Sequence, residues 1–215
     1  MAYRMLDISK WQSTFNAELA KQNGIHTVIS RCAYSTSKDS KWDSFSDAIK
    51  SSGMNFGCYG FTVSHYKSVS TNLADARTKI FSELESWIEL AQNAGVNSWF
   101  AIDQELEANQ QMVLSKDENT TLLIDACDKA KNAGLNPCVY CSAAWAMQYI
   151  DLERFKYPLW IAYYYKYGTD LDFTNSSASF PTGTYGQFLA SLGTQLAAWQ
   201  FTAEGYGKLY GAGSD

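Results

Sequence analysis

Three acidic side chains follow a short apolar run near the middle of the chain: Asp103, Glu105 and Glu107 come directly after Trp99 to Ile102. In a β-strand, residues two apart share a face, so a strand that continues through Glu105 brings Asp103 and Glu105 to about 6.6 Å between α-carbons. Two carboxyls this close raise the pKa of one of them. A protonated carboxyl beside a carboxylate suits glycoside cleavage. The alternative is an acidic strand end in solvent, and we assign Glu107 such a surface role.

Composition narrows the possible partners. The chain has 215 residues and a net charge of −5, with acidic and basic residues interspersed. It has no basic patch of the kind that binds nucleic acid and no apolar run long enough to span a membrane. The 7 Trp, 14 Tyr and 11 Phe suit either an aromatic core or a cleft that stacks on sugar rings. We expect a monomer that binds neither nucleic acid nor membrane.

The cysteines and histidines do not suggest a metal site. The only close pair, Cys138 and Cys141, lies in an apolar strand-like run where the two sulfurs face opposite sides. There are two histidines, and we interpret His65 as an ordinary loop residue. We therefore expect reduced thiols, no metal and no cofactor. The first residues lack the apolar segment of a secretory signal, so we expect synthesis in the cytoplasm without one.

Predicted strands alternate with predicted helices along the chain. Strands are expected at 3–8, 26–31, 56–62, 137–141, 159–163 and 196–201, and one begins with the apolar run at 99–102. Helices are expected at 14–22, 45–52, 69–94, after the capping box at 115–118, and at 143–149. Residues 173–193 are expected to form a long loop. This order predicts a parallel α/β sheet. Because the last third loses its helices, we predict an irregular, shortened TIM-like β/α barrel, with residues 1–215 as a single domain.

Polar side chains interrupt the apolar pattern where the predicted strands end. In a parallel barrel the carboxyl ends of the strands meet on one face, where active sites form. The sequence therefore predicts one cluster on that face, made of Asp7, Arg31, Tyr59, Asp103, Glu105, Tyr140, Tyr163 and Gln200.

Six short motifs run in order from the first strand to the end of the chain. They are Asp7-Ile-Ser-Lys-Trp-Gln12, Ile102-Asp-Gln-Glu105, Val139-Tyr-Cys-Ser142 with Trp145, Pro158-Leu-Trp-Ile-Ala162, Ala198-Trp-Gln-Phe201 and the glycine-rich stretch that ends at Asp215. Together they resemble the motifs of glycoside hydrolase family 25 lysozymes, the Chalaropsis-type muramidases. The spacing before Asp215 departs slightly from the family pattern, and we expect no separate wall-binding module within these 215 residues.

The resemblance implies a peptidoglycan hydrolase that cleaves the β-1,4 bond from N-acetylmuramic acid to N-acetylglucosamine. Glu105 would be the general acid, and Asp103 would orient the substrate's N-acetyl group or guide a water. Asp7 and Asp215 would flank the sugar on the non-reducing side of the cut bond. Substrate binding would fall to the remaining candidates, Tyr59, Tyr140, Tyr163, Arg31 and Gln200. Arg31 could instead pair on the barrel rim.

Two other functions remain open at this stage. One is a barrel that binds cell-wall carbohydrate without turnover, and the other is a glycosidase for another N-acetylated polymer such as chitin. If the resemblance holds, the partner is a peptidoglycan glycan strand. We then expect action on the bacterial wall after release from the cell, as in phage lysis.

Overall fold

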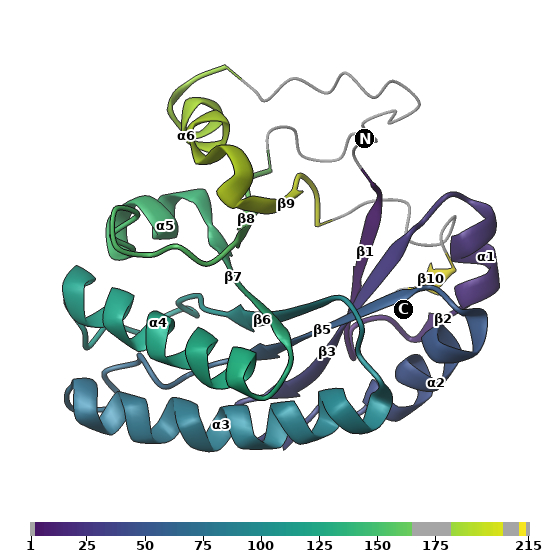
Figure 1. Ribbon diagram of the computed structural model, residues 1–215, viewed down its shortest axis with the longest axis horizontal. Helices are drawn as coiled ribbons and strands as arrows, with labels where there is room; N and C mark the ends of the chain where they lie inside the picture. The colour runs from purple at the N-terminus through teal and green to yellow at the C-terminus, as the bar shows by residue number, and fades with distance from the viewer. Residues whose placement is uncertain (1–2, 165–181, 204–210, 214–215) are drawn as a thin grey trace.

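A curled parallel sheet forms the centre of the molecule in the computed structural model, which describes residues 3–164, 182–203 and 211–213 (Figure 1). Its order is β1 (Met5–Ile8), β3 (Thr27–Tyr34), β5 (Asn55–Phe61), β6 (Trp99–Asp103), β7 (Asn136–Ser142), β8 (Leu159–Ala162) and β9 (Leu196–Gln200). Neighbours along this order are parallel, and the short β4 (Ser37–Lys38) pairs antiparallel with β3. A separate two-stranded sheet pairs β2 (Thr14–Phe15) antiparallel with β10 (Ala212–Gly213). The curled parallel sheet forms a half-barrel, which confirms the predicted shortened TIM-like β/α barrel.

Helices cover the outer side of this sheet (Figure 1). They are α1 (Ala17–Gln22), α2 (Trp42–Ser52), α3 (Leu73–Ala94), α4 (Lys116–Asn132), α5 (Ala143–Tyr149) and α6 (Thr184–Leu192), with a 3-10 turn at Gly193–Gln195. The helix α3 begins where the Asn72 side chain accepts the Asp75 N–H and ends at Gly95, whose φ of 73° suits glycine. Its buried apolar side chains recur at helical spacing and pack on the sheet, namely Ala76, Ile80, Leu84, Trp87 and Ala91.

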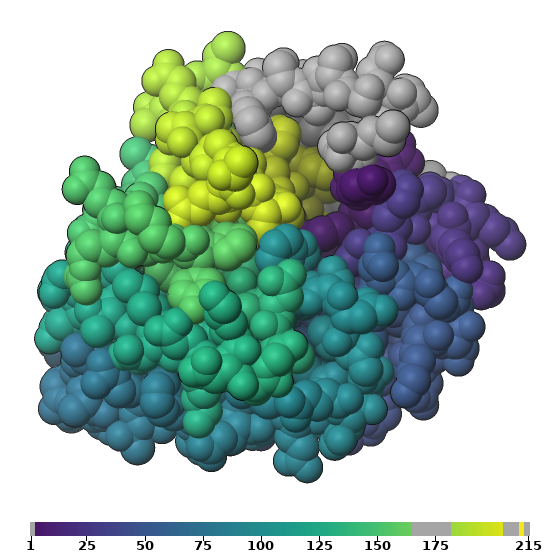
Figure 2. Space-filling model, in the orientation of Figure 1, coloured from purple at the N-terminus to yellow at the C-terminus, as the bar shows by residue number. Residues whose placement is uncertain are grey.

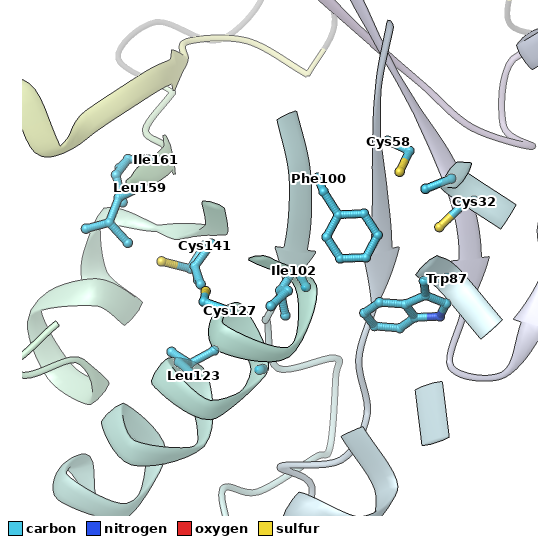
Figure 3. Close-up of a cluster of buried hydrophobic side chains, with 14 of the residues drawn as sticks. Cys32, Cys58, Trp87, Phe100, Ile102, Leu123, Cys127, Cys141, Leu159 and Ile161 are labelled. Atoms are coloured by element: carbon cyan, nitrogen blue, oxygen red, sulfur yellow. The ribbon is translucent and has the colours of Figure 1, made fainter. Parts of the chain in front are cut away.

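The core between sheet and helices depends on one close approach. A Cβ at Gly60 would lie 2.2 Å from the Trp87 ring, so only glycine lets the indole sit against β5. Figure 3 shows this indole beside Phe100 and Ile102 of β6. The Trp87 Nε1–H donates to the Ser35 carbonyl at 2.7 Å, which satisfies its polar edge. The five cysteines are free and buried.

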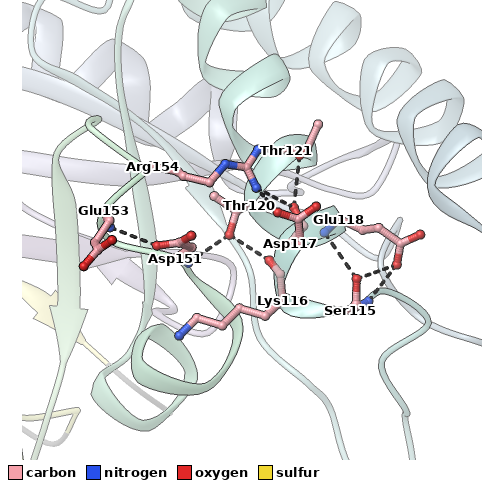
Figure 4. A network of polar contacts seen from close by, with 9 residues as sticks. All are labelled: Ser115, Lys116, Asp117, Glu118, Thr120, Thr121, Asp151, Glu153 and Arg154. Carbon is pink, nitrogen blue, oxygen red and sulfur yellow. Dashed lines mark hydrogen bonds and ion pairs between the residues drawn. The ribbon is translucent and has the colours of Figure 1, made fainter.

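A polar network fixes the start of α4 (Figure 4). Ser115 and Glu118 form the predicted capping box, each side chain accepting the other's backbone N–H. Arg154 forms an ion pair with Asp117, and the Asp151 N–H donates to Thr120 Oγ1 at 2.9 Å. These contacts tie the segment after α5 to α4.

The predicted loop at 173–193 is wrong where the structure describes it. Residues 184–192 form α6, which buries Phe188, Leu189 and Leu192 and packs on α5. Figure 2 shows residues 182–203 lying beside 143–164. Serine, threonine and glycine obscured this helix in the sequence, and its tertiary contacts with α5 stabilise it. Within the described residues, no helix is both long and apolar enough to cross a membrane.

Candidate active site

Asp103 and Glu105 lie at the carboxyl end of β6, in the middle of the sheet. The condition for a shared strand face, a strand that continues through Glu105, is not met, because β6 ends at Asp103. The backbone stays anchored there: the Thr62 N–H donates to the Asp103 carbonyl and the Gln104 N–H to the Tyr140 carbonyl, both at 3.0 Å. Asp103 is buried, whereas Glu105 is partly exposed. The residues that follow β6, and not a continuation of the strand, therefore fix where the Glu105 carboxyl lies relative to that of Asp103.

Burial raises the pKa of every carboxyl in this cluster. For Asp103 the pKa rises well above its usual range through burial, then through the charges of Glu105 and Asp7, while Arg31 opposes the rise. The pKa of Glu105 is raised by burial and by Glu107. One oxygen of Asp103, Oδ1, is buried without a hydrogen-bond partner among the described residues. The cluster therefore holds at least one proton more readily than separate carboxyls would.

Asp7 and Gln200 connect the two edges of the sheet. The Gln200 Nε2–H of β9 donates to Asp7 Oδ2 of β1 at 3.0 Å. Gln200 Oε1 accepts the hydroxyls of Tyr140 at 2.6 Å and Tyr164 at 2.8 Å, which fixes the orientation of the amide. Burial raises the pKa of Asp7 to about 7, although hydrogen bonds from Tyr59 and Gln200 and the charge of Arg31 lower it. The structure thus brings Asp7, Tyr59, Tyr140 and Gln200 together as predicted.

Tyr164, not Tyr163, reaches this network. The Tyr163 N–H continues the ladder to the Gln200 carbonyl at 3.0 Å, and its ring packs against Tyr185 of α6 at 5.2 Å between centroids. Trp160 lies on the inner face of β8 and strand alternation turns Tyr164 the same way. Alternation counted from Trp160 would have found Tyr164 in the sequence.

Arg31 pairs with a carboxylate that the sequence reasoning did not include. Its Nε–H donates to Asp39 Oδ2 at 2.7 Å, and that carboxylate also accepts the N–H groups of Lys10 and Lys41. Arg31 is buried, and its Nη2 has no hydrogen-bond partner among the described residues. Its charge still lowers the pKa of Asp7 and of Asp103. Arg31 therefore combines a structural pair with an electrostatic effect on the cluster.

A second layer of polar side chains, missed in the sequence, holds the turn that carries Glu105. His65 is completely buried, and its Nε2–H donates to the Glu105 carbonyl at 2.8 Å. Burial lowers the pKa of His65 to about 4, so the ring is neutral near pH 7. Gln104 exchanges two hydrogen bonds with Asn119, at 2.9 and 3.0 Å, and accepts the Trp145 Nε1–H. In the sequence these residues could have been noticed only as polar positions among apolar ones. Their hydrogen-bond partners lie on other elements, so the sequence did not show which residues they contact.

Glu107 is also tied to this turn. Glu107 is exposed, but its Oε2 accepts the Tyr34 hydroxyl at 2.7 Å and its backbone N–H donates to Tyr66 Oη at 3.3 Å. The Tyr34 ring stacks on Phe61 with 5.0 Å between centroids. These contacts keep a second carboxylate close to Glu105.

A cavity of ≈ 350 Å³ opens on the α5 side of Glu105. Its wall combines Glu105 and Leu106 with Ser142, Trp145, Gln148 and Tyr149. Asp215 lies outside the described residues. Within the residues that the structure describes, no three His, Cys, Asp or Glu side chains are grouped so that they could hold a metal ion.

Comparison with known proteins decides the family. A family model described as glycosyl hydrolases family 25 matches residues 6–208. The chain belongs to glycosyl hydrolase family 25. This confirms the resemblance seen in the motifs and makes the chain a glycoside hydrolase. No curated protein sequence matches the chain.

Solved structures share the fold of this family 25 chain. The catalytic domain of endolysin ply40 from Listeria monocytogenes bacteriophage P40 has a TM-score of 0.64 at 20% identity, with 100% of this chain and 90% of that chain covered. A muramidase from Acremonium alcalophilum gives 0.66 at 19%, covering 98% and 91%. The autolysin LytC from Streptococcus pneumoniae, solved with a synthetic peptidoglycan ligand, gives 0.66 at 20%, covering 94% of this chain and 43% of LytC.

Proposed function

We propose that this chain is a lysozyme that hydrolyses the β-1,4 bond from N-acetylmuramic acid to N-acetylglucosamine in peptidoglycan. Its family membership supports glycosidic cleavage, and the endolysin, muramidase and peptidoglycan-bound autolysin among the similar structures support the substrate. The observation that carries the proposal is the position of Glu105, whose charge acts on the carboxyls of Asp103 and Asp7 and whose side chain also lines an open cavity.

Glu105 acts as the general acid. Its carboxyl gives a proton to the glycosidic oxygen while the bond from that oxygen to the anomeric carbon breaks and its electron pair stays on the oxygen. Positive charge then develops at the anomeric carbon, and the carboxyls of Asp7 and Asp103 lower its free energy electrostatically. Because burial raises the pKa of Glu105, the acid form persists at higher pH than for a free glutamic acid.

A water completes the reaction. Its hydroxide portion bonds to the anomeric carbon and its remaining proton returns to the Glu105 carboxylate, so the acid is regenerated. Asp103 either guides this water or orients the N-acetyl group, whose oxygen attacks the anomeric carbon before the water does. Tyr59, Tyr140 and Gln200, with Tyr164, fix the Asp7 side of the cleft through hydrogen bonds.

The same proposal gives a partner and a place of action. The partner is the glycan strand of peptidoglycan, the working unit is a monomer, and the site of action is the bacterial wall after release of the enzyme from the cell. The net charge of −5 adds no attraction to an anionic wall, so short-range contacts in the cleft must supply the binding free energy.

Cleavage of purified cell walls by a Glu105→Gln variant tests the proposal. Loss of a general acid typically costs 10²–10⁴-fold, so we expect turnover at least a hundredfold lower with an unchanged fold. Glu89→Gln, an exposed change on the outer helix α3, is the matched control and should keep wild-type turnover. A folded Glu105→Gln protein that clears walls at nearly the wild-type rate would refute the assignment.

The new reducing ends identify the bond. Muramic acid ends support the proposal, and glucosamine ends indicate a glucosaminidase. Release from chitin but not from walls indicates the chitin-type glycosidase, whereas no release from either indicates a binding protein.

A further inference from the structure

An acid interrupts the apolar face of α3. Glu83 lies three residues after Ile80 and four before Trp87, both of which are completely buried, and Glu83 itself is only 2% exposed. It takes part in none of the ion pairs that the described residues form. A carboxyl buried without a cation destabilises a fold unless hydrogen bonds compensate for the lost water. The contacts of Glu83 therefore indicate why an acid occupies this position.

Glu83 holds the residues that directly follow β5. Its Oε2 accepts the Thr62 hydroxyl, and its Oε1 accepts the Val63 N–H at 3.3 Å. Thr62 Oγ1 in turn accepts the Ser64 hydroxyl at 2.8 Å and the Ser64 N–H at 3.2 Å. Burial raises the pKa of this carboxyl, whereas the hydrogen bonds from Thr62, Ser35 and Val63 lower it. One buried side chain of α3 thus fixes the path of the backbone beyond β5.

The same segment, residues 62–66, holds the backbone of the two central acids. The Thr62 N–H donates to the Asp103 carbonyl at 3.0 Å, and the His65 Nε2–H donates to the Glu105 carbonyl at 2.8 Å. Both acceptors are backbone oxygens, so these bonds leave the two carboxyls for the reaction. The position of the segment therefore determines where the two acids lie relative to each other.

We propose that Glu83 is a positioning residue, which sets the place of the Asp103 and Glu105 carboxyls through residues 62–66. Backbone contacts with residues 111–113 hold the far end of this segment, and the Glu83 carboxyl provides a side-chain anchor at its start. This inference rests on the proposed function, in which those two carboxyls carry out the chemistry. A proton transfer needs its donor in place, and a misplacement of about 1 Å can cost roughly 10²-fold in rate.

Loss of this anchor should lower turnover and leave binding nearly unchanged. Neither Glu83 nor residues 62–66 line the cavity beside Glu105. The surface that the substrate meets there should therefore persist, and KM should change by less than about twofold. We expect kcat to fall about 10- to 100-fold, because the acids are displaced from the reacting bond.

Three variants, assayed on a soluble peptide-free glycan of alternating muramic acid and glucosamine units, separate hydrogen bonding from charge and packing. Glu83→Leu accepts no hydrogen bond and should show the full loss of kcat. Glu83→Gln should stay within about threefold of wild type. Its Oε1 can accept the Val63 N–H while its Nε2–H donates to Thr62 Oγ1, whose own proton then turns to Ser64. Ile49→Val, a buried change on α2, is the matched control and should lower the melting temperature without changing kcat.

A second variant tests the same contact if Glu83→Leu does not fold. Thr62→Val replaces the hydroxyl with a methyl group and keeps the backbone N–H that donates to the Asp103 carbonyl. It should lower kcat about 3- to 10-fold, as expected for one lost hydrogen bond. Combined with Glu83→Leu it should add little, because both changes remove the same bond.

Each other outcome overturns the assignment. A folded Glu83→Leu or Thr62→Val protein with wild-type kcat removes Glu83 from positioning. Equal losses in Glu83→Leu and Glu83→Gln assign the effect to the charge, and losses that follow the melting temperature, shared by Ile49→Val, assign it to the fold. Glu105→Gln is measured in parallel. If Glu105→Gln stays active, the proposed function itself fails, whereas an inactive Glu105→Gln beside an unaffected Glu83→Leu refutes only the role of Glu83.

Discussion

Replacing Asp7 with asparagine should make the protein more stable and less active. The carboxyl of Asp7 is enclosed at the edge of the sheet, where its Oδ1 has no hydrogen-bond partner among the described residues and its Oδ2 accepts the Gln200 Nε2–H at 3.0 Å. The free-energy cost of burying the charged carboxylate is the largest effect on Asp7, and it raises the pKa from 3.8 to about 7. Asparagine has nearly the same shape as the protonated acid and carries no charge to bury.

The size and sign of the effect follow from this pKa. Below pH 3.8 the carboxyl is protonated in both states and the substitution changes little. Between pH 3.8 and about 7 the unfolded chain releases the proton while the folded protein holds it, so wild-type stability falls as pH rises. Above pH 7 the difference levels off at about 4 kcal/mol. Asp7→Asn should therefore gain almost nothing at pH 3.5 and up to about 4 kcal/mol at pH 8.

Urea unfolding at pH 3.5, 6 and 8, with wall lysis measured on the same samples, tests this reasoning. Asp39→Asn is the matched control, because its carboxylate is buried but paired with Arg31 at 2.7 Å. Breaking that pair should cost roughly 3–5 kcal/mol, the opposite sign. A loss of stability at pH 8 in Asp7→Asn would show that the charged form is the favoured one and would refute the argument. A gain that does not grow with pH would point to packing instead.

Three further substitutions test the acid cluster. Asp103→Asn should lower turnover severely and move the alkaline limb of the kcat/KM profile to lower pH, because a negative neighbour of Glu105 is removed; an unchanged profile would show that the two carboxyls are not coupled. Glu107→Gln should move the same limb in the same direction but by less, and the difference should shrink in high salt because the residue is exposed; no movement at low salt would leave Glu107 with only a surface role. Asp215→Ala should reduce wall lysis with little change in melting temperature, and a wild-type lysis rate would remove Asp215 from the site.

Local signals in the sequence predicted most of the elements. The apolar stripe of α3, the capping box at Ser115 and the alternation of strands and helices are short-range patterns that act through hydrogen bonds and burial within one element. The acids at 103 and 105 could be identified as a pair because they are neighbours in the chain. The chemistry of the site was therefore predictable from adjacent residues.

Long-range contacts decided what the sequence could not. The hydrogen bond from Gln200 to Asp7 joins residues 193 positions apart, and it forms because the sheet curls until its two edge strands face each other. His65 became part of the site only because its loop folds against the Glu105 carbonyl, and α6 formed because α5 offers it an apolar surface. Residue types and spacing determined which chemistry this protein carries. The curl of the sheet and the packing on it decided which side chains hold that chemistry in place, since those contacts have no trace in any single stretch of sequence.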